Sequence, residues 1–278
     1  MDFLNVMQTY FRGEKIEAAL FIAPVGLLLV GIAIGAWRSE SGALMWGAVV
    51  PAAIFGLMLA GTGIGIAAIS ATYNMTDPDP ERLAAGRRAF IAICELTSGM
   101  GCHIVTVCSG SKHAKDKWRR HPSNDDPQSW TEMCREFDII CDHADRHGVL
   151  VGVEPEPANI VSNAMRAADL LAAFPGGPIR MVLDPANLIE DVTPESHERT
   201  IDQALDRLGP MTVLAHAKDR HADGAVVPAG KGVIDWPHFL RGLEACGFDG
   251  PLIAHGMSQS DAPAVAEFLT SRVRRLVP

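Results

Sequence analysis

The sequence predicts an α/β fold, in which parallel strands alternate with helices to form a barrel or an open sheet, preceded by an apolar segment. The first observation concerns four strand-like segments that each stop at a side chain able to bind a divalent metal: Glu154, Asp184, His216 and His255. Their intervals of 30, 32 and 39 residues each fit one strand, one helix and two loops. The second is a change of composition near Thr76, because charged residues are almost absent between Ala18 and that point.

The apolar N-terminal region, residues 1–64, is predicted to be a transmembrane helical hairpin. Ala18–Trp37 carries no charge over about 20 residues, which is enough helix to cross a bilayer core. A second uncharged run covers residues 43–69, with small residues that membrane helices tolerate. A signal peptide and a buried core helix remain as alternatives.

The charges around these runs predict the orientation in the membrane. Arg12 and Lys15 precede the first run, whereas Arg38 is the single cation of the short connecting loop, which places the N-terminus in the cytoplasm. Two spans return residues 65–278 to the cytoplasm. The six cysteines agree, because they form no CxxC pair and look like buried thiols of a reducing compartment.

The region from residue 65 onward is predicted to contain six strands and six helices. Apolar runs predict strands at residues 65–70, 103–108, 149–153, 179–183, 211–215 and 252–254. Helices are expected at about 80–99, 129–147, 164–173, 195–208, 236–246 and 262–276. Asp79 and Pro80 start the first helix with a capping side chain, and Gly148 ends the second. Strict alternation implies parallel strands with right-handed crossovers.

The number of strands is too small for the commonest closed parallel barrel, which has eight strands and about 250 residues. Residues 65–278 number 214, so about two βα units are missing at the N-terminal end. The net charge of -9 and the pI near 5.5 also exclude a duplex nucleic-acid binder, which needs a basic face.

The strand ends predict a metal site. Glu154 and Asp184 each follow an apolar strand and precede a proline, and His216 adds an imidazole. Carboxylate and imidazole ligands together favour Mn²⁺, Zn²⁺ or Co²⁺ over Mg²⁺ or Ca²⁺. Alternatives are a carboxylate that pairs with a neighbouring loop for Glu154 and a helix cap for Asp184.

Further polar residues near these strand ends are candidates for substrate binding: Glu156, Asn187, Lys218, Asp219 and Arg220. Lys218 could instead form a Schiff base, but its acidic neighbour favours a charged, hydrogen-bonding lysine. The loop at residues 109–127 is rich in charge and tryptophan, and its Lys117–Arg120 stretch could close over a polyol or its phosphate.

From about Gly65 the chain resembles the sugar phosphate isomerase/epimerase group of xylose isomerase-like TIM barrels, which includes the endonuclease IV relatives. The matching segments are AISATYNM, VGVEPE, VLDPAN, HAKDR and GKGVIDW before GFDGPLI. The resemblance implies that Glu154, Asp184 and His216 are metal ligands and that Asn187 adds a polar contact. His255 departs from the pattern, because the family commonly has a glutamate there that is both a ligand and an acid/base group.

The resemblance implies an incomplete (β/α) TIM-barrel-like domain that acts as a metal-dependent sugar or sugar-phosphate isomerase or epimerase. Glu154 is then the base and a ligand, and His255 a ligand or second acid/base group. A phosphoester hydrolase and a non-catalytic, membrane-anchored binding domain are the alternatives. The first strand matches the third strand of the family, so the first two βα units are absent and the sheet has open edges. These edges could pair with another chain in a homo-oligomer. A fusion, a degraded enzyme or a chimeric reading frame would each explain the N-terminus, and in the last case the domain is cytoplasmic.

Overall fold

The computed structural model describes residues 7–12, 15–20, 65–190 and 193–273. Six parallel strands form one sheet in the order β3-β4-β5-β6-β7-β9. Their bounds are β3 Ile69–Ser70, β4 Ile104–Val107, β5 Leu150–Val153, β6 Ile179–Leu183, β7 Thr212–Arg220 and β9 Leu252–Ala254. All six predicted strands are confirmed, although the first is only two residues long.

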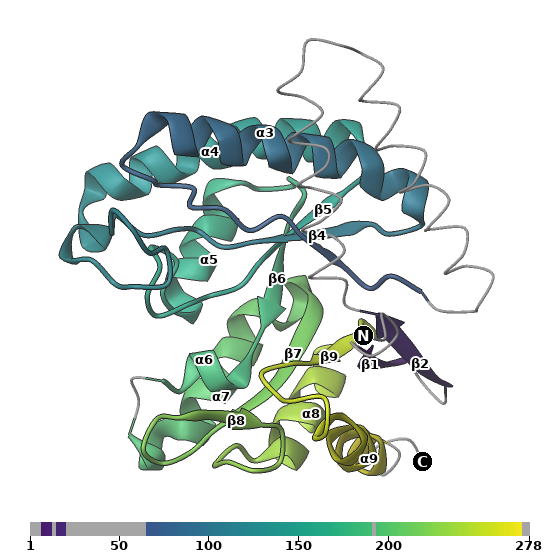
Figure 1. Cartoon of the computed structure of the whole chain (residues 1–278). Coiled ribbons are helices and arrows are strands. Elements are labelled where there is room, and N and C mark those ends of the chain that lie inside the picture. Colours follow the sequence, from purple (N-terminus) through teal and green to yellow (C-terminus); the bar gives the residue numbers. More distant parts are fainter. Residues whose placement is uncertain (1–6, 13–14, 21–64, 191–192, 274–278) are drawn as a thin grey trace.

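The helices cover the outer face of this sheet, with α3 and α4 side by side (Figure 1). Their bounds are α3 Pro80–Thr97, α4 Pro127–Arg146, α5 Ala164–Ala173, α6 Pro185–Leu188, α7 His197–Leu208, α8 Trp236–Ala245 and α9 Ala262–Val273. Short 3-10 helices cover Ser98–Met100, Pro122–Asp125, Pro194–Ser196 and Gly209–Met211. Side-chain caps explain several starts: Asn163 accepts two backbone N–H groups at α5, and Asp235 accepts one at α8.

Within the sheet domain, one strand and one short α-helix were not predicted. β7 runs five residues beyond the predicted end at 215, because its last residues pair antiparallel with β8 Val226–Pro228 through a turn that contains Gly224 at φ 89°. The helix α6 directly follows β6, where the sequence predicted a loop. Both features lie at the carboxyl end of the sheet.

The core has two layers. The larger packs the helices against the outer sheet face, with Val105, Val151 and Met181 among its fully buried strand residues. The smaller lies on the inner face and joins Val182, Leu214 and Ile253 from three strands. Because side chains alternate along a strand, the residue two positions later on each strand also faces inward.

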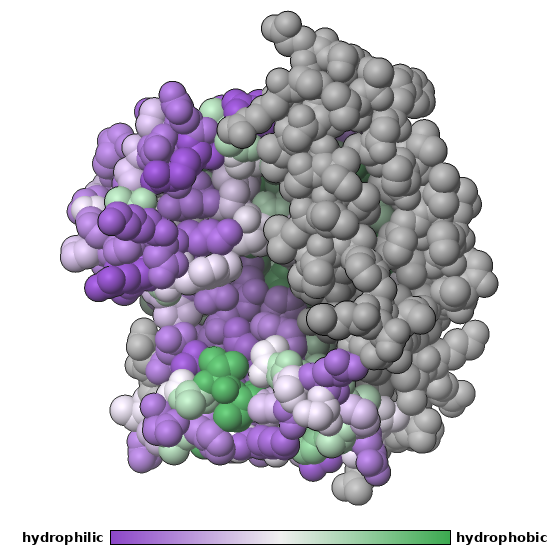
Figure 2. All heavy atoms as spheres, viewed as in Figure 1, coloured by the Kyte–Doolittle hydropathy of each residue, from purple (hydrophilic) through white to green (hydrophobic). Residues whose placement is uncertain are grey.

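The described sheet is a half-barrel with β3 and β9 as its outer strands, so the predicted incomplete TIM-barrel-like domain is confirmed. On the face shown in Figure 2, hydrophilic residues line a recess between the upper and lower parts of the molecule. The carboxyl ends of parallel strands share one edge of the sheet, so functional side chains are expected there.

The described part of the N-terminus is a hairpin of two antiparallel strands, β1 Met7–Arg12 and β2 Lys15–Leu20, and β1 lies beside β9 (Figure 1). The predicted span Ala18–Trp37 is therefore wrong over its first three residues, which belong to β2. Its remainder and residues 43–64 of the second predicted run lie outside the described residues. Within the described ranges, no helix combines the length and apolar character that crossing a membrane requires.

Candidate active site

The candidate site stands on the inner sheet face, directly above an apolar floor. Gly152, Val182, Leu214 and Ile253 form this floor on β5, β6, β7 and β9. Two residues further along the same four strands come Glu154, Asp184, His216 and His255. Glycine suits the first position, since a Cβ on Gly152 would lie 3.0 Å from Cγ2 of Val182. The pleat of the strands therefore aims the four predicted groups at one region.

Asp184 is the centre of the contacts. Its side chain is fully buried, and its Oδ2 lies 3.1 Å from Nε2 of His255 and 3.1 Å from Nζ of Lys218. Its other oxygen, Oδ1, accepts the backbone N–H of Ala186 at 2.9 Å and so caps α6. Asp184 therefore caps a helix through Oδ1, as the alternative interpretation expected, and contacts the other predicted site residues through Oδ2.

His216 brings a nitrogen without a hydrogen bond into this cluster. Its Nδ1 lies 3.2 Å from Oε2 of Glu154 and 3.8 Å from Oδ2 of Asp184. Neither contact has hydrogen-bond geometry, so this buried atom has no hydrogen-bond partner within the described structure. The ring of His255 stands edge-on to that of His216, with centroids 4.4 Å apart.

Donor atoms of Asp184, His216 and His255 lie within 4.8 Å of one another. First-shell bonds of about 2 Å place two donors at most roughly 4 Å apart, so the three groups would have to close by a few tenths of an ångström to bind one cation. Glu154 touches the cluster through His216 but is not one of these three residues. The structure thus brings together three of the four predicted ligands and places the fourth beside them.

The pKa values of the titrating groups in the cluster shift in opposite directions. Burial opposes the charged form of His216, but the carboxylates of Glu154 and Asp184 outweigh it and raise the pKa of His216. Burial and the neighbouring His216 lower the pKa of His255. For Asp184, burial alone would raise the pKa, but the contacts to His255 and Lys218 lower it. One imidazole therefore holds its proton more firmly than the other.

Two further predicted residues lie at the rim of the cluster. Asn187 follows Asp184 on α6, and its Nδ2 donates to Oε1 of Glu154 at 2.7 Å. Burial and the charge of Glu154 raise the pKa of the Glu156 carboxyl to about 8. Asn187 was predicted only as a further polar contact, and the structure shows that it orients Glu154.

Asp219 does not belong to the site, and its predicted substrate-binding role is corrected. Its carboxylate is fully buried and accepts four N–H groups, from Arg220, Gly230, Ile234 and the Trp236 indole. These donors lie within the next seventeen residues, so Asp219 fastens the segment after β7 to the strand. The sequence shows the acid but not the loop that folds back around it.

Arg220 is likewise engaged by protein groups. Its guanidinium binds the Glu190 carboxylate at 2.9 Å and the carbonyl oxygens of Ala186 and Gly224. Lys218 is the one member of the Lys218–Arg220 stretch in contact with Asp184 among the described contacts. Burial disfavours its charged form, but Asp184 and Glu154 outweigh this and raise the pKa of Lys218, so it is held as an ammonium group.

The chain belongs to the xylose isomerase-like TIM barrel family, because the sequence model of that family matches residues 52–271. The match begins inside the second predicted membrane run, upstream of the boundary expected at residue 65. No curated protein matches the chain.

Solved structures share the fold. The chain is similar to 3-keto-D-glucoside 4-epimerase from E. coli, with 17% identity, a TM-score of 0.62, and coverage of 90% of this chain and 86% of that one. A D-tagatose 3-epimerase-like protein shows 15% identity and a TM-score of 0.64, with 82% and 85% covered. A xylose isomerase-like TIM barrel protein from Mycobacterium smegmatis in complex with magnesium shows 17% identity and a TM-score of 0.60, with 81% and 78% covered.

Proposed function

We propose that the chain is a metal-dependent isomerase or epimerase of a sugar or sugar phosphate. The observation that carries the proposal is the convergence of donor atoms from Asp184, His216 and His255 within 4.8 Å of one another, above an apolar floor at the carboxyl end of the sheet. Membership of the xylose isomerase-like family and structural similarity to sugar epimerases support the same reaction class.

The residues present fit a divalent cation. Nδ1 of His216 is a buried nitrogen that lies 3.2 Å from Oε2 of Glu154 without hydrogen-bond geometry, so it can offer its lone pair to a cation when the ring is neutral. Asp184, His216 and His255 would hold the ion, with Glu154 beside them, and this mixture of oxygen and nitrogen donors suits Mn²⁺, Zn²⁺ or Co²⁺. A cation there would polarise a substrate carbonyl and make the adjacent C–H more acidic.

The chain's own groups then move the proton. In the metal-free protein burial opposes ionisation of Glu154, but the positive charge of His216 outweighs it and lowers the pKa of Glu154, and a bound cation would supply positive charge at the same place, so this carboxylate is available as a base. Asn187 fixes its orientation through Oε1. After taking the proton from carbon, Glu154 can return it to the same or the adjacent carbon on one face.

Inversion at a carbon requires a second group on the opposite face, and His255 is the candidate if it does not bind the ion, because a neutral imidazole has one free lone pair for either role. When neutral, it donates Nε2–H to Oδ2 of Asp184, which leaves Nδ1 as a proton acceptor. The Lys218 ammonium can bind a substrate oxygen on the side of Asp184.

Deuterium exchange tests this proposal whichever product the reaction forms. The full chain is incubated in D₂O with Mn²⁺, Zn²⁺ or Co²⁺ and with D-tagatose, L-ribulose or a 3-keto-D-glucoside. We expect NMR to show deuterium at the carbon next to the carbonyl, and none after Asp184→Asn or after removal of metal with a chelator. Exchange that survives Asp184→Asn, or that never occurs with any metal and sugar, contradicts the proposal.

A further inference from the structure

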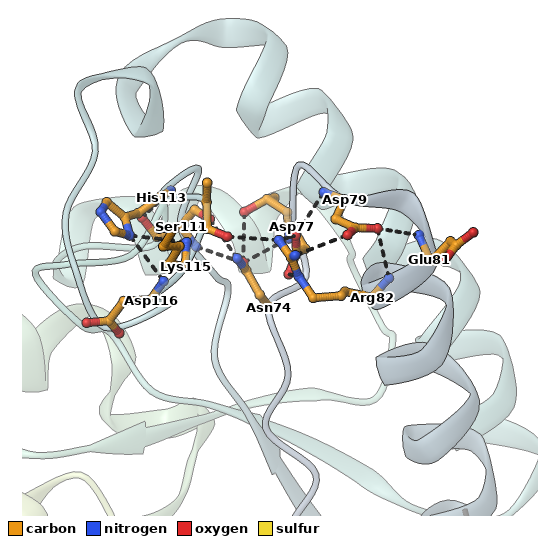
Figure 3. A network of polar contacts seen from close by, with 11 residues as sticks. Asn74, Asp77, Asp79, Glu81, Arg82, Ser111, His113, Lys115 and Asp116 are labelled. Atoms are coloured by element: carbon orange, nitrogen blue, oxygen red, sulfur yellow. Dashed lines mark hydrogen bonds and ion pairs between the residues drawn. The ribbon is translucent and has the colours of Figure 1, made fainter.

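A polar pocket lies outside the candidate metal site, beside the loops that follow β3 and β4. Figure 3 shows polar contacts among several of its residues. It has a volume of about 570 Å³ and is lined by Asp77 and Arg82 on one side and by the segment His113–Trp118 on the other. Apart from Lys117 and Trp118, these residues were not predicted to bind a ligand, because only the fold brings them together.

Trp118 supplies an aromatic surface to this pocket. Trp118 is 51% exposed, and Nζ of Lys117 lies 5.3 Å from the centroid of its ring. That ammonium also donates to the carbonyl of Thr72 at 2.9 Å, so Lys117 fixes the indole against the β3 loop. An exposed but positioned tryptophan presents a flat apolar face to a ligand.

The charges of the pocket are largely paired within the protein. Arg82 binds Asp77 at 2.7 Å and Asp79 at 3.0 Å, and a further hydrogen bond joins it to the carbonyl of Ala114 (Figure 3). The N-terminus of α3 is also occupied, since Oδ1 of Asp79 accepts the N–H groups of Glu81 and Arg82. This pairing weakens the field that would hold a phosphate and suits a neutral polar ligand.

Hydrogen-bonding capacity nevertheless remains around the indole. Nδ1 of His113 accepts the N–H of Asp116 at 3.1 Å, so the neutral ring carries its proton on Nε2 as a donor. One oxygen of Asp116 accepts the N–H of Trp118 at 2.9 Å, which leaves the other as an acceptor. Lys115 adds an exposed ammonium group. Donors and acceptors around an aromatic face match the alternating hydroxyls and apolar C–H face of a sugar ring.

Hydrogen bonds connect the pocket to the strand that carries Glu154. Asn159, in the loop after β5, accepts the N–H of Gly110 at 2.8 Å and donates to the carbonyl of Lys117 at 3.1 Å. Because β3, β4 and β5 are adjacent and strands lie about 4.8 Å apart, the loops after β4 and β3 begin about 5 and 10 Å from the end of β5, after which Glu154 follows.

We propose that this pocket is a subsite for a second, neutral sugar ring, stacked on Trp118, so that the preferred substrate is a glycoside rather than a free sugar or a sugar phosphate. The inference rests on the proposed function for the position of the reacting ring. The pocket itself can be tested by binding, without catalysis.

The experiment measures binding of cellobiose, maltose, glucose, glucose 6-phosphate and inorganic phosphate to the full chain by calorimetry. At least one disaccharide is expected to bind about tenfold or more tightly than glucose, a difference that Trp118→Ala removes and Trp118→Phe largely retains. Met165→Ala is the matched control, because Met165 is an apolar residue on α5 that is 63% exposed and lies outside both sites. This variant should bind like the wild type.

Three results would overturn the subsite. They are equal binding of the disaccharides and glucose, disaccharide binding unchanged in Trp118→Ala, and phosphate binding that depends on Lys115 but not on Trp118. Failure of the proposed function looks different. Trp118-dependent disaccharide binding without any deuterium exchange would retain the subsite and reject the isomerase, whereas exchange of free and glycosidic sugars with equal kcat/KM would do the reverse.

Discussion

Two clusters of buried ionisable groups differ in how completely the protein satisfies them. In the closed cluster, Glu136 accepts hydrogen bonds from Tyr73 at 2.5 Å and from Arg87, whose Nε lies 2.9 Å from Oε1. In the open cluster, formed by Glu154, Asp184, His216, Lys218 and His255, several charges share Asp184 and a buried nitrogen of His216 lacks a hydrogen bond. The first cluster is complete within the chain, whereas the second is not.

The difference agrees with a structural role for the closed cluster and with the functional role proposed for the open one. The closed cluster joins the segment after β3 to α3 and α4, and Gly86 permits the close approach, since a Cβ there would lie 2.4 Å from the Tyr73 ring. Its guanidinium, carboxylate and hydroxyl need nothing from outside. The open cluster keeps a buried nitrogen without a hydrogen bond, so it retains the capacity to bind a ligand that the closed cluster lacks.

The largest expected effect comes from the open cluster. Asp184→Asn should lower the rate of deuterium exchange below detection, by about 10²–10⁴-fold or more, because it weakens the ligand set and removes the charge that orients His255 and Lys218. Glu136→Gln, which keeps oxygen and amide groups in the closed cluster, should leave exchange per folded molecule within about threefold. Equal losses in the two variants would erase the functional distinction between the clusters.

The closed cluster should dominate stability instead. Glu136→Ala leaves Arg87 and Tyr73 without their buried partner and should lower the free energy of unfolding by about 3–5 kcal/mol. Glu132→Ala is the matched control one turn earlier on α4, where the carboxylate pairs with Lys112 near the surface, and should cost at most about 1 kcal/mol. Urea unfolding followed by circular dichroism gives both values. Similar values for the two variants would show that burial of Glu136 adds nothing.

Metal binding should complete the open cluster measurably. An added Mn²⁺, Zn²⁺ or Co²⁺ ion at a hundredfold excess over its Kd should stabilise the chelator-treated protein by about 2.7 kcal/mol. His216→Ala should abolish this gain, whereas His238→Ala should keep it, since His238 pairs with Asp202 on the surface between α8 and α7. Thermal unfolding with and without the ion measures the shift. A gain that persists in His216→Ala would place the ion elsewhere.

The open cluster was largely predictable from the sequence because parallel strands deliver their ends to one edge. Glu154, Asp184, His216 and His255 each follow an apolar run, and a period of two places them on the same face as the floor below. All six strands of the half-barrel were found in the same way. What the pattern cannot give is distance, so it did not show that Glu154 stands slightly apart from the other three.

The closed cluster and the misassigned Asp219 depend on contacts between remote segments. Glu136 lies 63 residues from Tyr73 and 49 from Arg87, and it looks like any acid on an amphipathic helix. Asp219 shares its strand with His216, but the return of the segment around Trp236 buries it and uses its oxygens. Local pattern predicts which face a residue occupies, whereas tertiary packing decides whether its polar atoms are free.

The smallest effect tests whether a complete ion pair stabilises the fold when one of its two partners is exposed. Asp77 and Arg82 form a complete pair, but the Arg82 side chain is 52% exposed. Burial would raise the pKa of Asp77, yet the hydrogen bond and charge of Arg82 and the backbone N–H of Asp79 together outweigh it and lower that pKa below the ordinary value of 3.8. A carboxyl group whose pKa is lowered on folding stabilises above that ordinary value and loses its contribution as the pH falls below it.

Asp77→Asn should therefore cost up to about 1 kcal/mol at pH 7, and the difference from the wild type should shrink as the pH falls below about 4. Asp125→Asn is the control, because Asp125 pairs with Arg120 and both side chains are exposed, at 68% and 47%. Its effect should stay below about 0.5 kcal/mol. Urea unfolding between pH 3 and pH 8 measures both variants. A cost for Asp77→Asn as large as that of Glu136→Ala would mean that complete pairing stabilises regardless of solvent, and the contrast between the clusters would no longer depend on burial.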